Sequence, residues 1–149
     1  MRRTALAAVI VSVTMLCGCM GKNINAVSYD EFSQTMLDEG YCAEDSISTT
    51  DTEDGTSSVV LTNNGWLAGF YECSSDEIAE NEFYGECEAV GIKEVKELGK
   101  NGLSAEKITE NGFVLYIKVG KTCLMMMGPE TKSSEMKSFA KELGYYNDK

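Results

Sequence analysis

The sequence contains no histidine, and this absence excludes several kinds of chemistry. Ser-His-Asp triads and Cys-His pairs need an imidazole that takes a proton from the nucleophile, so the chain can form neither of them. No two cysteines stand in a Cys-x-x-Cys spacing. The absence of this spacing argues against a zinc site and against a thioredoxin-like redox centre. We therefore expect no resident metal and no cofactor.

Long apolar runs are also missing. The charge-free stretch 5–16 is shorter than the roughly 20 apolar residues that a transmembrane helix needs. Arg2 and Arg3 precede this stretch and small residues follow it. That order is typical of a secretory signal peptide, so we expect an exported protein.

The end of this stretch reads Leu16-Cys17-Gly18-Cys19. It resembles the lipobox of bacterial lipoprotein precursors, which reads Leu, a tolerant position, Gly or Ala, and then Cys. Cys17 is a departure, because the tolerant position usually holds a small or β-branched residue. The resemblance implies that Cys19 is diacylated and becomes the mature N-terminus, which holds the protein on the extracytoplasmic face of the cell membrane. The alternative is an ordinary signal peptide cut near Gly21.

The resemblance divides the chain into three parts. Residues 1–18 form the lipoprotein signal peptide, residues 19–27 the lipidated cysteine and a short tether, and residues 28–149 a single domain. A free tether of this length reaches about 25–30 Å at 3.3–3.6 Å per residue. We expect the domain to act close to the membrane.

Basic residues are scarce, with 13 Lys and Arg against 24 Asp and Glu. No basic residue occurs between Lys22 and Lys93. Nucleic acids bind basic patches, so this acidic stretch disfavours them as partners. It favours a cationic protein or a divalent ion. The alternative is that the carboxylates only keep an exported protein soluble.

Four cysteines remain after residue 19: Cys42, Cys73, Cys87 and Cys123. An even number in an exported chain predicts two disulfides. Cys87 lies about three helical turns after Cys73, too far for the 7 Å between α-carbons that a disulfide allows. Two connectivities remain open, namely 42–73 with 87–123, and 42–87 with 73–123.

Three helices are predicted. Ser28 and Glu31 form a capping box before a helix that ends at Gly40. Ser74 or Ser75 caps a second helix, which continues to residue 90. A third amphipathic helix is expected over residues 131–143.

Most of the remaining chain is expected to form hairpins. Residues 59–61 and 66–73 make one hairpin around Asn63-Asn64-Gly65. A two-residue Asn64-Gly65 loop would place Leu61 opposite Ala68. Further strands are expected at 103–109, 113–119 and 122–127, whereas residues 44–57, rich in Ser, Thr, Asp and Gly, predict a solvated loop.

These elements predict the α+β class, with the order α-β-β-α-β-β-β-α. About five strands built from hairpins would form an antiparallel sheet packed with three amphipathic helices. The layout is loosely similar to that of uncharacterised small lipoproteins of Gram-positive bacteria, a likeness that implies no activity.

Two candidate binding sites follow from the residues. Asp51, Glu53 and Asp54 resemble the start of a calcium loop, although the glycine stands one position early and the twelfth-position glutamate is absent. Trp66 could form a sugar-stacking platform with Tyr71 and Tyr84. The alternatives are a plain acidic loop and a tryptophan that packs between strands.

The sequence favours a non-enzymatic binding module with an acidic surface, bound to the membrane through Cys19. A second hypothesis is an inhibitor or immunity-type protein that captures a basic exported enzyme such as a lysozyme. A third is an enzyme of the cell envelope that uses paired carboxylates.

Overall fold

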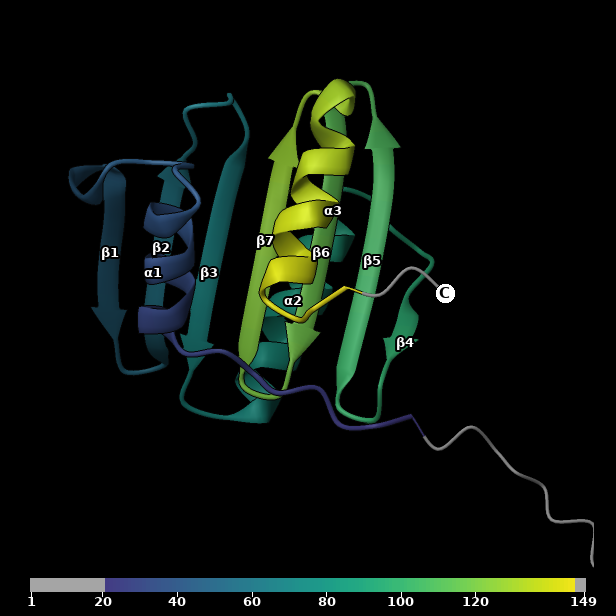
Figure 1. Ribbon diagram of the computed structural model, residues 1–149. Coiled ribbons are helices and arrows are strands. Elements are labelled where there is room, and N and C mark those ends of the chain that lie inside the picture. The colour runs from purple at the N-terminus through teal and green to yellow at the C-terminus, as the bar shows by residue number, and fades with distance from the viewer. Residues whose placement is uncertain (1–20, 147–149) are drawn as a thin grey trace, which may run out of the picture.

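The computed structural model describes residues 21–146 (Figure 1). The predicted signal peptide and lipobox, with Leu16, Cys17, Gly18 and Cys19, lie outside the described residues, as do residues 147–149. Within the described part, three α-helices and a seven-stranded antiparallel sheet follow one another in the order α-β-β-β-α-β-β-β-β-α. Among residues 21–146, none of the helices has the length and hydropathy of a membrane span.

The sheet has the strand order β1-β2-β3-β7-β6-β5-β4, so that β1 and β4 form its edges. Its strands are β1 (Ile47–Thr52), β2 (Gly55–Leu61), β3 (Leu67–Cys73), β4 (Lys96–Leu98), β5 (Gly102–Thr109), β6 (Gly112–Val119) and β7 (Thr122–Gly128). The helices are α1 (Tyr29–Asp38), α2 (Asp76–Ala89) and α3 (Ser133–Glu142), with 3-10 turns η1 (Glu44–Ser46) and η2 (Glu130–Lys132). The α+β class, the three helices and the antiparallel, hairpin-built sheet are confirmed.

The sheet separates two cores. α1 and α3 cover one face, and α2 covers the other (Figure 1). The first core contains Phe32 of α1, whose ring contacts Phe70 of β3 and Phe139 of α3. The second core contains Phe83 of α2 and Tyr116 of β6. We call these the α1/α3 core and the α2 core.

The helices α1 and α2 begin at their predicted caps. The Ser28 hydroxyl accepts a hydrogen bond from the Glu31 amide at 3.2 Å, and the Glu31 carboxylate accepts one from the Ser28 amide at 2.7 Å. Each bond satisfies an amide that the first helical turn leaves unpaired. In α2 the Ser75 hydroxyl accepts from the Ile78 amide at 3.1 Å.

The predicted loop over residues 44–57 is wrong. These residues form η1, β1 and the first part of β2. β1 is an edge strand whose side chains are almost all exposed on both faces, so its sequence shows no alternation. β4 at the other edge was also not predicted, because it is only three residues long and its side chains are mostly exposed. The expected sheet of about five strands is therefore corrected to seven.

The hairpin register differs from the expected one by one residue. Leu61 pairs with Leu67 and Val60 with Ala68. A two-residue type I′ loop needs positive φ at both central residues, but among the described non-glycine residues none has positive φ. The loop is therefore longer, and the Thr62 amide donates to the Trp66 carbonyl at 2.9 Å.

All four described cysteines are free and buried. Cys42 lies in the α1/α3 core, whereas Cys73, Cys87 and Cys123 lie in the α2 core. Both connectivities from the sequence join Cys42 to one of the other three. The structure does not show these pairs, because the sheet lies between Cys42 and the α2 core.

Candidate functional site

Residues 21–27 form an ordered segment along one end of the sheet, which we call the strap. The side chain of Asn101, in the β4–β5 turn, pairs with the backbone of Ile24. Its Oδ1 accepts from the Ile24 amide and its Nδ2 donates to the Ile24 carbonyl, both at 2.8 Å. The Lys100 amide donates to the Lys22 carbonyl at 3.3 Å. The expected free tether is therefore bound to the domain over these residues.

The second half of the strap is fixed by Tyr145, which follows α3. Its hydroxyl accepts from the Val27 amide at 2.8 Å and lies 2.6 Å from the Thr122 hydroxyl. The Thr122 hydroxyl donates to the Val119 carbonyl at 2.9 Å, so Tyr145 donates to Thr122. Burial raises the pKa of Tyr145 and keeps its hydroxyl protonated.

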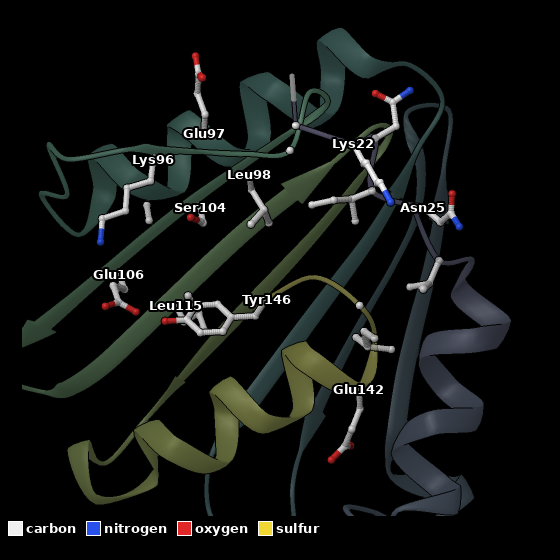
Figure 2. A pocket seen from close by; sticks show the side chains of 18 of the residues that line it. Lys22, Asn25, Lys96, Glu97, Leu98, Ser104, Glu106, Leu115, Glu142 and Tyr146 are labelled. Carbon is white, nitrogen blue, oxygen red and sulfur yellow. The ribbon is translucent and has the colours of Figure 1, made fainter. Parts of the chain in front are cut away.

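A groove opens between the strap, β4, β5 and the end of α3, with a volume of about 1280 Å³. Figure 2 shows Lys96, Glu97 and Leu98 on the β4 side, and Glu142 and Tyr146 on the α3 side. Apolar lining comes from Ile24, Val27, Leu98, Leu115 and Leu143. Polar side chains such as Lys96, Glu97 and Glu106 line it as well, and such a mixture is typical of ligand sites.

One ion pair borders the groove. Lys137 Nζ lies 3.0 Å from Glu106 Oε2, and it also lies over the rings of Phe113 and Tyr146, at 5.3 and 5.7 Å from their centroids. Burial alone would lower the pKa of Lys137, but the Glu106 carboxylate raises it. Burial and then the Glu39 charge raise the pKa of Glu142.

The predicted acidic site forms the β1–β2 turn. Asp51 lies in β1, where its carboxylate accepts a hydrogen bond from the Thr56 hydroxyl at 2.7 Å. Gly55 follows Asp54 with φ +137° and packs against the Glu72 backbone. Within residues 21–146 no three Asp, Glu or Cys side chains are grouped as metal ligands. Glu53 and Asp54 of the expected calcium loop therefore lie in an exposed turn, and Asp51 lies in the adjacent strand.

Trp66 is fully buried and does not form a stacking platform. Its ring contacts Tyr41 and Phe139. Tyr71 packs against the α2 core on the other face of the sheet, and Tyr84 is an exposed residue of α2. The structure thus separates the three aromatic residues, and Trp66 is a packing residue.

The acidic half of the chain does not gather on one face. Its carboxylates lie on α1, on α2 and in the β1–β2 turn, and these helices lie on opposite faces of the sheet.

The groove and the strap contacts were not predicted from the sequence. Asn101 and Tyr145 come from distant segments, and neither stands in a motif.

No protein-family model and no curated protein matches this chain. Among solved structures, the chain is similar to a GTP binding regulator from Thermotoga maritima. The TM-score is 0.55 at 18% sequence identity, over 83% of this chain and 89% of that chain. At this identity the likeness concerns the fold alone.

Proposed function

We propose that the protein is a bacterial lipoprotein, held on the extracytoplasmic face of the cell membrane by lipid on Cys19, and that its domain is a non-enzymatic binding module. The observation that supports this proposal best is the groove. Apolar and polar side chains both line it, and one of its walls is the strap that follows Cys19.

The chemistry of the groove suits an amphipathic ligand. Ile24 and Leu98, both partly exposed, offer apolar surface to a hydrocarbon part, while Asn25, Lys96 and Glu97 offer hydrogen bonds to a polar part. The Glu106 carboxylate is already paired with a lysine. Such a pair fits binding better than proton transfer, which needs a group free to change its charge.

The anchor is tested by the mass of the mature N-terminus. We expect a diacylated Cys19, and we expect a Cys19→Ala variant to leave the membrane fraction. An unmodified Cys19, or a first residue elsewhere with unchanged membrane association, would refute the anchor.

The groove is tested by filling it. Ser104 lines the groove on β5, so Ser104→Trp should obstruct it. Ser48→Trp, on the exposed edge strand β1, is the matched control. With the apolar dye Nile red as the probe, we expect Ser104→Trp to weaken binding at least about fivefold. Equal binding by both variants would exclude the groove as the binding site.

A second candidate is the inhibitor that captures a basic exported enzyme. It is supported by the exposed edge of β1, whose unpaired backbone groups can add a strand from a partner. This edge leads into the acidic turn with Asp51, Glu53 and Asp54. Binding to hen lysozyme should then fall steeply with salt, and amide substitutions at the three acids should weaken it. Salt-insensitive binding contradicts this candidate.

A further inference from the structure

Three lysines come together at the end of the sheet where the strap is bound. The hydrogen bond from the Lys100 amide to the Lys22 carbonyl brings these residues together. The Gly120 amide donates to the Asn101 carbonyl at 3.0 Å, which places Lys121 of the β6–β7 turn beside the β4–β5 turn. All three lysines are exposed, and within residues 21–146 none of them forms an ion pair.

The strap fixes this end relative to the start of the chain. Lys22 follows Cys19 by three residues, so an extended chain between them spans about 10 Å at most. A freely moving tether up to residue 27 would allow the domain to turn in any direction. With the strap bound, a membrane that holds Cys19 must lie near Lys22.

The charge of the molecule is arranged unevenly around this point. The acidic β1–β2 turn lies at the same end of the sheet but on the β1 side, since Gly55 pairs with Cys73, whose amide donates to the Lys121 carbonyl. An anionic surface attracts the lysine side and repels the β1 side. These forces act within a Debye length of roughly 8–10 Å, which is comparable to the reach from Cys19.

We propose that Lys22, Lys100 and Lys121 form a surface that binds the headgroups of anionic phospholipids and orients the anchored domain. The inference rests on the proposed lipid anchor. The β4–β5 and β6–β7 turns face the bilayer, the strands rise from it, and the β1 edge is tilted away. The groove then opens beside the membrane surface, and the β5–β6 turn with Glu110 points away from it.

The orientation can be measured as a height above the bilayer. The lipidated protein is reconstituted into vesicles of phosphatidylcholine, with or without about one third phosphatidylglycerol. A donor dye is attached through a Glu110→Cys substitution, and an acceptor dye is placed on the lipid headgroups. We expect energy transfer to be at least about twofold lower in the anionic vesicles, because the β5–β6 turn is then held far from the surface.

Two charge-reversal variants separate the lysine surface from general charge effects. K100E/K121E should remove the difference between the two vesicle types. K93E/K107E makes the same change in net charge at exposed positions toward the opposite end of β5, where Lys107 lies beside Val90 and Gly91, and it should keep the difference. Equal transfer in both vesicle types, or equal effects of the two variants, would overturn the proposal.

Failure of the anchor has a different signature. A protein without lipid fails to float with either vesicle type, and the orientation then falls together with the anchor. A protein that floats fully with both vesicle types but shows unchanged energy transfer refutes the orientation alone.

Discussion

The indole N–H of Trp66 donates a hydrogen bond of 3.1 Å to the Glu135 carboxylate and thereby ties the β2–β3 loop to α3. Asn64 donates to the same oxygen, and Lys132 Nζ lies 3.2 Å from the other one. Burial alone would raise the pKa of Glu135, but the hydrogen bonds from Trp66 and Asn64 and the charge of Lys132 lower it. The ionised carboxylate therefore stabilises the fold.

We expect Glu135→Gln to lower the free energy of unfolding near neutral pH by about 1–2 kcal/mol, because hydrogen bonds to a charged acceptor are lost. A carboxylate whose pKa is lowered by folding stabilises the protein fully above its pKa in the unfolded chain, about 4.3. This stabilisation is lost as the pH falls through its pKa in the folded protein. The difference between wild type and variant should therefore shrink below about pH 4. Urea unfolding followed by Trp66 fluorescence measures it, and a difference that is constant with pH would contradict the assignment.

Tyr145→Phe should release the strap. The substitution removes the partly buried acceptor of the Val27 amide and the buried donor to Thr122, so we expect a loss of about 1–2 kcal/mol in the free energy of unfolding. Hydrogen exchange at the Val27 amide should become faster than exchange in β6. Tyr84→Phe, at an exposed tyrosine of α2, is the control. Unchanged exchange at Val27 would show that Tyr145 does not hold the strap.

The sequence predicted those elements that have caps or clear periodicity. Ser28, Glu31 and Gly40 mark both ends of α1, and the strands β5, β6 and β7 lie within a few residues of their expected bounds. β1 could not be predicted in this way, because a strand exposed on both faces needs no apolar side chain on either.

Long-range pairing explains the other errors. The sequence gives no sign that Lys118, in an apolar strand, is buried beside Asp76 of α2 at 2.8 Å. The burial of Trp66 likewise depends on contacts with Tyr41 and Phe139, which lie far away in the chain. The groove follows from such tertiary packing, so no local pattern predicted it.

The four thiols should be unreactive in the native protein. Burial raises the pKa of Cys42, Cys73, Cys87 and Cys123. The thiolate is the reactive form, so we expect slow labelling by Ellman's reagent at about pH 8. A chain beginning at Met20 and purified without reductant should release four equivalents in denaturant, matching the four free cysteines of the structure. Fewer equivalents would show that the folded domain forms a disulfide after all.

Tyr116 offers a test in which removing a polar group stabilises the fold. Its side chain is fully buried in the α2 core, and its hydroxyl has no hydrogen-bond partner in the described part of the chain. A buried hydroxyl without a partner costs about 1–3 kcal/mol, so we expect Tyr116→Phe to be more stable than wild type by up to about 1 kcal/mol near neutral pH. Tyr84→Phe should change stability by less than about 0.5 kcal/mol, as exposed substitutions usually do.

The same variant carries a pH signature. Burial, followed by the charge of Glu86, raises the pKa of Tyr116 to about 12. For a tyrosine whose pKa is raised by folding, stability is complete below its pKa in the unfolded chain, about 10. It is lost as the pH rises through its pKa in the folded protein. Between about pH 10 and 12 wild type should therefore lose stability that Tyr116→Phe keeps, and the gap between them should widen. Chemical unfolding across this range measures the gap, and a gap that stays constant would mean that the hydroxyl has a partner able to stabilise its ionised form.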